Sequence, residues 1–183
     1  YIHMKWYNEP VKWDYENDTL SMFVTQKSDY WRITHYGFIQ DNGPFYYTNI
    51  EGDFEVSVKI KGNYNTLYDQ MGLMLRLDEE HWIKTGVEYV DGVYNLSTVT
   101  TNKHSSWNII PLRSNLKQIW IKAIRKTDAV EIYYSLDGEI YIMSNISYLP
   151  KQKNIMAGMM AASPKGKGFE ATFEEFKITG LSN

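Results

Sequence analysis

Cysteine is absent from this chain of 183 residues, and proline occurs only five times. Without thiols the protein can form neither a disulfide nor a structural zinc site built on thiolates. A chain without disulfides is compatible with a reducing compartment, so we expect a cytoplasmic protein. No apolar run approaches the roughly 20 residues that a membrane helix needs. We therefore expect no membrane partner.

The chain also has no concentrated run of charge of one sign. The formal net charge is −3, and the basic residues are spread along the chain rather than gathered in a stripe. A nucleic-acid-binding domain normally carries a basic stripe, so we expect no nucleic-acid partner. The first residues, YIHMKW, have no apolar signal-peptide core. We interpret residues 1–3 as a cloning remnant and Met4 as the native start, within a single domain spanning 1–183.

Aromatic residues are abundant, at 15% of the chain, with 15 Tyr and 6 Trp. These residues favour strands and half-wet surfaces. Apolar stretches recur at short spacing with turn residues between them, and no stretch has a sustained helical period with caps. Asp91-Gly92 and Asp137-Gly138 are strong hairpin turns. We predict an all-β sandwich of two antiparallel sheets with about 12 to 14 strands, over 19–25, 29–34, 52–62, 68–78, 81–90, 93–101, 105–110, 117–126, 129–136, 139–145, 154–162 and 168–178.

The stretch 68–101 predicts an unusual polar face. Alternation in the first strand places Gln70 and Arg76 opposite the apolar core residues. In the next strand Trp82, Lys84 and Glu88 share one face. If the two strands form a hairpin, these side chains lie together on one sheet surface, with Ser97 beside them on the following strand.

Two interpretations of this face remain open. It is either an ordinary solvated surface with cross-strand ion pairs, or a concave binding surface where Trp stacks on a sugar ring while polar groups bind its hydroxyls. Gly72 and Gly86 on the same face would leave a shallow groove for a ligand or a neighbouring backbone. Beside Lys84 and Arg76, we expect the pKa of Glu88 to be lowered.

Further clusters extend the candidate surface. The segment DYWRITHYG at 29–37 contains Trp31 and Arg32, and SSW at 105–107 contains Trp107. Together with YDQMGLMLR, HWIKTGVEY, GMMAASP and GFEATFEEF, these motifs resemble an uncharacterised family of concanavalin A-like proteins, described as regulation-of-enolase-like. The resemblance runs from about Trp6 to Ile178. It implies a jelly-roll sandwich of the lectin and glucanase type.

The resemblance also implies a set of motif positions, without implying a function. Where the family usually has Asp in its last motif, this chain has Ser106, which weakens any claim for a carboxylate there. Fold does not imply function, and sandwiches of this kind include lectins, glycosidases and interaction domains. The implied positions are Asp29, Trp31, Arg32, Thr34, Asp69, Gln70, Gly72, Arg76, Trp82, Lys84, Glu88, Ser97, Thr100 and Trp107.

The sequence contains no clear catalytic or metal-binding motif. The nearest approach to a glucanase E-x-D-x-x-E motif is Glu51, Asp53 and Glu55, which reads more simply as a turn. The four His residues are scattered without H-x-H or H-E-x-x-H spacing, so we expect no metal site. No glycine-rich phosphate loop is present, so we expect no cofactor.

Three functional hypotheses follow. The first is a non-catalytic sandwich that binds a carbohydrate or another small polar ligand. The second is a regulatory domain that binds a protein partner. The third is a glycan-active hydrolase that uses Glu88 with a second carboxylate, Asp69. For the first, the candidate ligand-binding residues are Trp31, Arg32, Gln70, Arg76, Trp82, Lys84, Glu88, Ser97 and Trp107.

Overall fold

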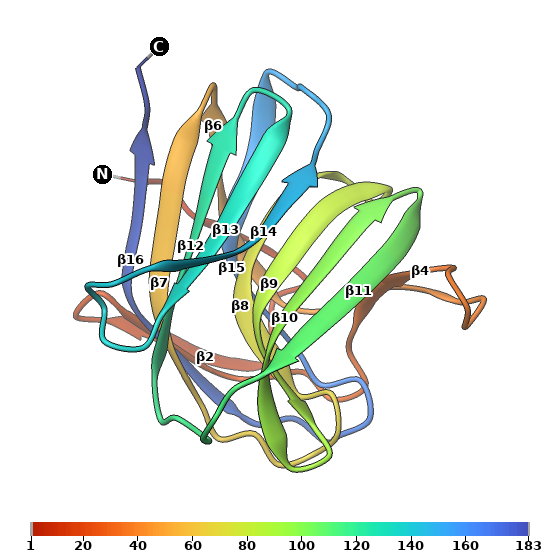
Figure 1. Cartoon of the computed structure of the whole chain (residues 1–183). Coiled ribbons are helices and arrows are strands. Elements are labelled where there is room, and N and C mark those ends of the chain that lie inside the picture. Colours follow the sequence, from red (N-terminus) through yellow and green to blue (C-terminus); the bar gives the residue numbers. More distant parts are fainter. Residues whose placement is uncertain (1, 183) are drawn as a thin grey trace.

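Two seven-stranded antiparallel sheets pack face to face in the computed structural model, which describes residues 2–182 (Figure 1). Tyr1, the first residue interpreted as a cloning remnant, and Asn183 lie outside the described residues. The strand order of the first sheet is β1 (Lys5–Tyr7), β6 (Phe45–Glu51), β15 (Asn154–Ala162), β8 (Gln70–Asp78), β9 (His81–Val90), β10 (Val93–Asn102) and β11 (His104–Pro111).

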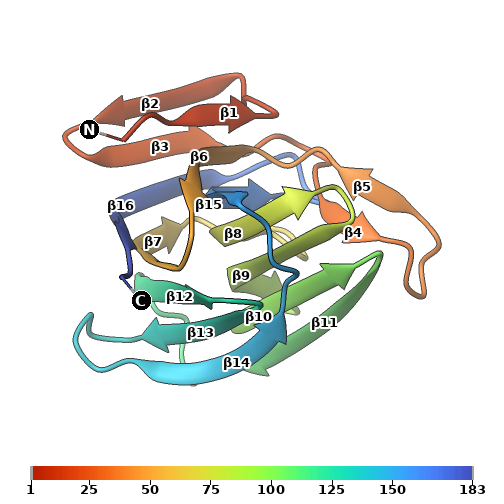
Figure 2. The same cartoon turned by 90° about the horizontal axis from the view of Figure 1, so that it is seen from above.

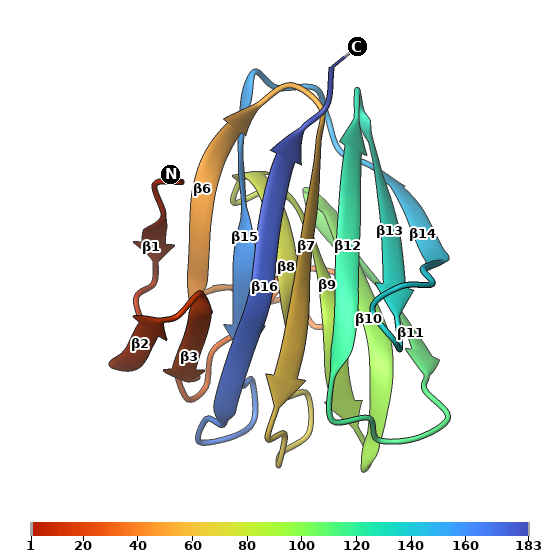
Figure 3. The ribbon, with the colours of Figure 1, turned by 90° about the vertical axis from the view of Figure 1, so that its left-hand side faces the viewer.

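The second sheet covers one face of the first, as Figure 3 shows with β16, β7 and β12 in front. Its strand order is β14 (Ile142–Tyr148), β13 (Ala129–Ser135), β12 (Ile119–Lys126), β7 (Phe54–Gly62), β16 (Glu170–Gly180), β3 (Thr19–Phe23) and β2 (Lys12–Glu16). The predicted all-β sandwich of two antiparallel sheets is confirmed, and it is consistent with the concanavalin A-like jelly roll. Between residues 2 and 182 no helix is long and apolar enough to cross a membrane.

The core lies between the sheets because each central strand alternates between apolar and polar residues. On β7, Phe54, Val56, Val58 and Ile60 are at most 1% exposed, and the residues between them are only half-buried. They pack in one cluster with apolar side chains from both sheets. Burying each such side chain stabilises the fold by about 1.5–3 kcal/mol.

Tight turns fix the register of the hairpins. Asp91 and Gly92 both have positive φ, 52° and 77°, as a two-residue turn between β9 and β10 requires. Asn17 and Asp18 make a similar turn between β2 and β3, with φ of 52° and 57°. The turn at Gly138 also forms, but β14 begins only at Ile142.

Four strands were not among the predicted ones: β1, β2, β5 (Ile39–Asp41) and β6. Every residue of β2 is exposed, so this strand has no buried face to produce an alternating pattern. On β6 both faces carry aromatic side chains, because Tyr46 packs on the core while Tyr47 packs on the outer side of the sheet. Neither strand therefore shows the alternation of apolar and polar residues by which strands are predicted from sequence.

A short hairpin lies on the side of the first sheet that faces away from the second. Strands β4 (Tyr30–Arg32) and β5 form it, and Figure 2 shows it beyond β8 and β9. We call residues 29–42 the arm, because the Asn42 backbone N–H donates to the Asp29 carbonyl at its base. The arm packs on the outer face of the first sheet through a second apolar cluster, which consists of Tyr30, Trp31, Phe45, Met74, Trp82, Val99 and Met160.

Candidate ligand-binding site

The outer face of the first sheet carries the predicted polar row. Residues 70–76 alternate as predicted, with the Met71 side chain in the core and the Met74 side chain on the outer face. Strands β8 and β9 pair so that Gln70 faces Glu88 and Arg76 faces Trp82. The prediction that these side chains share one surface is therefore confirmed. The face is buried rather than solvated, since Gln70, Arg76, Trp82, Lys84 and Glu88 are at most 6% exposed. The arm packs over one end of it.

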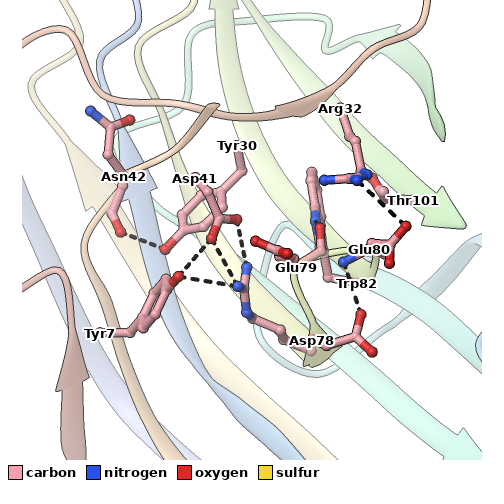
Figure 4. A network of polar contacts seen from close by, with 12 residues as sticks. Tyr7, Tyr30, Arg32, Asp41, Asn42, Asp78, Glu79, Glu80, Trp82 and Thr101 are labelled. Carbon is pink, nitrogen blue, oxygen red and sulfur yellow. Dashed lines mark hydrogen bonds and ion pairs between the residues drawn. The ribbon is translucent and has the colours of Figure 1, made fainter. Parts of the chain in front are cut away.

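Arg76 lies at the covered end and binds the arm rather than an open surface. Its two Nη atoms donate to the two carboxylate oxygens of Asp41 at 2.7 and 2.9 Å, and Nη2 also donates to the Tyr7 hydroxyl at 3.3 Å. The guanidinium carbon is 4.6 Å from the centroid of the Tyr7 ring. Figure 4 shows Tyr7, Asp41 and Tyr30 gathered at this point. This arrangement anchors the arm.

Trp82 and Arg32 also have structural contacts at this end. Trp82 is 1% exposed beneath Tyr30, with the ring centroids 5.8 Å apart in an edge-to-face arrangement. Its indole N–H donates to the Glu79 carbonyl at 3.1 Å. Arg32 makes an ion pair with Glu80 at 3.4 Å. The structure therefore places Arg76, Trp82 and Arg32 outside the pocket at the other end of the face.

That pocket has a volume of about 390 Å³ and lies between the arm, strands β8 to β11 and the loop 163–168. Its volume falls in the range typical of small-ligand sites. Among the predicted binding residues it brings together Trp31, Gln70, Lys84, Glu88 and Trp107, with Ser97 directly behind Glu88. The other lining residues are Lys27, Asp29, Tyr36, Phe38, Gln40, Tyr68, Val99, Pro164 and Lys165.

The two carboxylate oxygens of Glu88 differ in their hydrogen bonding to residues 2–182. The Ser97 hydroxyl and the Trp107 indole N–H donate to Oε1 at 2.7 and 3.0 Å. Oε2 accepts no hydrogen bond from the side chains or backbone of residues 2–182. Burial raises the pKa of Glu88 above its ordinary value, although Lys84 and the two hydrogen bonds act to lower it. The prediction of a lowered pKa was wrong, because Arg76 is paired with Asp41 and desolvation outweighs Lys84.

A second charged pair lies beside Glu88. The Lys84 ammonium is 3.3 Å from Oδ1 of Asp29, at the base of the arm. The same Asp29 oxygen accepts the backbone N–H of Tyr30 at 2.7 Å. Gln70 donates its amide N–H to the Tyr68 carbonyl at 3.0 Å, which leaves its side-chain oxygen as an acceptor. The floor of the pocket is thus polar and largely preorganised.

Aromatic rings form the walls. Trp31 and Tyr36 meet edge to face with centroids 5.6 Å apart, and Tyr68 and Trp107 do the same at 6.1 Å. Phe38 packs against Tyr36 at 5.8 Å. Tyr36 and Phe38 are 51% and 41% exposed, so part of each ring is free to contact a ligand. Sequence reasoning missed these two residues, although the density of aromatics in 29–38 was a usable signal.

Gly72 and Gly86 face each other across β8 and β9. A Cβ built on Gly72 would lie 1.9 Å from the Thr85 carbonyl oxygen, so here the neighbouring backbone takes the space. A depression of about 10 Å³ remains beside Gly86, next to Lys84 and Ser97. The predicted groove is therefore mainly a close approach of two strands.

Asp69 lies outside the pocket and is fully buried. Its Oδ2 accepts the backbone N–H groups of Asn65 and Thr66, and its Oδ1 accepts the Ser163 hydroxyl. Both oxygens therefore hold loops together. Asp29, rather than Asp69, is the carboxylate that shares the pocket with Glu88. Across residues 2–182 no three His, Cys, Asp or Glu side chains form a group that could hold a metal ion.

Comparison with known proteins identifies the family of this sandwich and relatives that share its sequence and fold. A family model described as "Protein of unknown function (DUF1349)" matches residues 6–181. The "Regulation of enolase protein 1" of Saccharomyces cerevisiae is 32% identical over 174 residues, covering 95% of this chain and 88% of that protein. A crystal structure of a functionally unknown S. cerevisiae protein superposes with a TM-score of 0.94 at 31% identity, covering 98% of this chain and 97% of that one.

More distant structures share the fold alone. A mutant of the GH43 protein BlXynB from Bacillus licheniformis superposes with a TM-score of 0.75 at 13% identity. The match covers 97% of this chain but 37% of that one. The present chain therefore corresponds to one part of that larger protein.

Proposed function

Because the chain belongs to the DUF1349 family of proteins of unknown function, its relatives supply no activity, and we propose from the pocket itself that the protein binds a carbohydrate. The ligand is the size of one or two sugar rings, as the volume of about 390 Å³ allows. Binding, rather than turnover, is the function that the geometry supports best.

The arrangement around Glu88 carries this proposal. Ser97 and Trp107 fix one carboxylate oxygen, and the other remains available as an acceptor for ligand hydroxyls. Lys84 is a donor and Gln70 an acceptor on the same floor. Aromatic walls beside a polar floor match a sugar, whose ring has apolar C–H faces and a hydroxyl-bearing rim.

One observation favours a second candidate, a glycan-active hydrolase. A carboxyl group with a raised pKa in a cleft suits a general acid, and Glu88 has this property. Asp29 would then be the second carboxylate. Release of nitrophenol from nitrophenyl glycosides, abolished by Glu88→Gln, would support the hydrolase over the binding protein.

The test compares two tryptophans with similar surroundings. Trp107 and Trp13 are 36% and 39% exposed, and each donates its indole N–H to a glutamate at 3.0 Å. Only Trp107 lines the pocket. Calorimetric titration would use a sugar panel: glucose, galactose, mannose and xylose, with glucuronate, galacturonate, glucose 6-phosphate and mannose 6-phosphate.

We expect at least one sugar of the panel to bind, and Trp107→Ala to weaken its binding about tenfold, since an aromatic contact of this kind is worth about 1–1.5 kcal/mol. Trp13→Ala should bind like the unmodified protein. No binding across the panel, or equal losses in both variants, would contradict the proposal.

A further inference from the structure

Two lysines at one corner of the pocket have no acidic partner among residues 2–182. From this corner we infer that the ligand carries an acidic group, a carboxylate or a phosphate, which Lys27 and Lys165 bind. The inference rests on the proposed carbohydrate binding and specifies the class of sugar. We call these two residues the lysine corner.

The balance of charge in the pocket points to an anion. Its lining includes three lysines and two carboxylates. Asp29 is paired with Lys84, and the Lys84 charge also acts on Glu88. Within residues 2–182, no carboxylate oxygen lies within the 4.0 Å ion-pair distance of Lys27 or Lys165. The excess positive charge is therefore located at the lysine corner.

Lys27 is exposed, but hydrogen bonds restrain both its side chain and its backbone. Its ammonium donates to the Lys165 carbonyl at 2.7 Å, and its backbone N–H donates to the Gly166 carbonyl at 3.3 Å. Asn42 donates to the Lys27 carbonyl at 3.3 Å. An ammonium has three donor hydrogens, so two remain for a ligand. Because the hydrogen bond to the Lys165 carbonyl already restrains the side chain, less conformational entropy is lost when an anion binds.

The loop that carries Lys165 is anchored as well. Ser163 is fully buried and donates its hydroxyl to Asp69 at 2.7 Å, and its backbone N–H donates to Ser28 at 3.1 Å. A Cβ on Gly166 would lie 2.7 Å from the Ser163 hydroxyl oxygen, so the turn is tightly packed. The backbone of Lys165 therefore has a fixed position beside Lys27.

This geometry assigns two ends to the ligand. The sugar ring lies on the floor near Glu88 and against the aromatic walls, and the acidic group lies at the lysine corner. Charge-assisted hydrogen bonds are about twice as strong as neutral ones, so the acidic group adds affinity as well as orientation. Uronic acids and sugar phosphates share this chemistry.

The test applies the sugar panel to the full chain and to Lys27→Met and Lys165→Met. Lys167→Met is the matched control, because Lys167 is an exposed lysine of the same loop that does not line the pocket. Lys27→Arg retains the charge. The Lys27 ammonium bonds to the backbone carbonyl of Lys165, so Lys165→Met tests the corner without removing that bond.

We expect acidic sugars to bind at least tenfold more tightly than their neutral counterparts. Each methionine substitution should remove most of that preference, while Lys167→Met and Lys27→Arg keep it. Added salt should weaken binding of the acidic sugars only. The uronates and the phosphates are separate arms of the panel and identify which acid is preferred.

Equal affinity for neutral and acidic sugars would overturn this inference and leave carbohydrate binding intact. A preference for acidic sugars that survives both Lys27→Met and Lys165→Met would also overturn it. No binding by any sugar of the panel would overturn the proposed function, and this inference with it.

Discussion

The two ends of the outer face carry ion pairs that are equally buried but differ in their geometry and in what lies beside them. At one end Arg76 binds Asp41 through two hydrogen bonds, beneath Tyr7 and Tyr30. At the other end Lys84 makes a single contact with Asp29 at 3.3 Å, and the floor opens into the pocket. Both cations come from adjacent strands of the same sheet, and both carboxylates come from the arm.

The difference shows that a polar row on a strand does not by itself define a site. The arm crosses the face at the Arg76 end and fills it with apolar side chains such as Tyr30. Near Glu88 it leaves the floor uncovered and lines the pocket instead, through Asp29, Trp31, Tyr36, Phe38 and Gln40. The first ion pair therefore fixes the arm, and the second lines the pocket.

The largest effect is expected from a substitution that breaks the ion pair between Arg76 and Asp41. Asp41→Asn leaves the Arg76 guanidinium, which is 4% exposed, without its countercharge. We expect a loss of about 3 kcal/mol in the free energy of unfolding, because an uncompensated buried charge is costly. Urea unfolding followed by fluorescence measures this loss.

A double variant serves as the control for that substitution. Arg76→Met combined with Asp41→Asn removes the stranded charge, so we expect it to recover a large part of the lost stability. If the single and double variants unfold at the same urea concentration, the pair does not anchor the arm.

A smaller effect is expected at the open end. Asp29→Asn removes the countercharge of Lys84, but Glu88 still acts on that ammonium. We expect a loss of about 1 kcal/mol in the free energy of unfolding, the value of one typical hydrogen bond, because Glu88 remains as a countercharge for Lys84. Urea unfolding measures this loss. A loss as large as that of Asp41→Asn would erase the distinction between the two ends.

The mildest substitution is Glu88→Gln, which we expect to stabilise the protein at neutral pH. A carboxyl whose pKa is raised by folding contributes stability that is fully present below its unfolded value, near 4.5. This contribution is lost as the pH rises through the folded pKa. The free energy of unfolding of Glu88→Gln should therefore increase relative to that of the unmodified protein as the pH rises from 4.5.

Thermal or urea unfolding across this pH range checks the expectation, with Glu170→Gln, at an exposed glutamate that begins β16, as the control. An advantage of Glu88→Gln that shrinks with rising pH would show that the carboxylate is stabilised, not destabilised, by its surroundings.

Most of the fold could be predicted from sequence because the central strands have one dry face. The alternation in β7 and the Asp91-Gly92 turn are local features that the sequence displays directly. Strand β2 could not be predicted in this way, since all of its residues are exposed. It pairs with β3 through backbone hydrogen bonds, which leave no pattern in the side chains.

The candidate site was predictable only in part, for a related reason. Period-two alternation identifies the outer-face position of Glu88 and Lys84, but it cannot say what covers that face. The cover comes from the arm, whose Asp41 contacts Arg76 across 35 positions of the chain. Likewise, Lys27 and Lys165 are 138 positions apart, and only the folded chain brings them together.

The anchored base of the arm has a consequence for how this scaffold can diversify. The Arg76–Asp41 pair and the buried Tyr30 hold residues near both ends of the arm, while Tyr36 and Phe38 project at its exposed tip. Substitution or lengthening of the tip would alter the rim of the pocket without disturbing either sheet. Selection could thus change which molecules the pocket accepts by substituting a few residues around Gly37, while the residues that determine the fold stay the same.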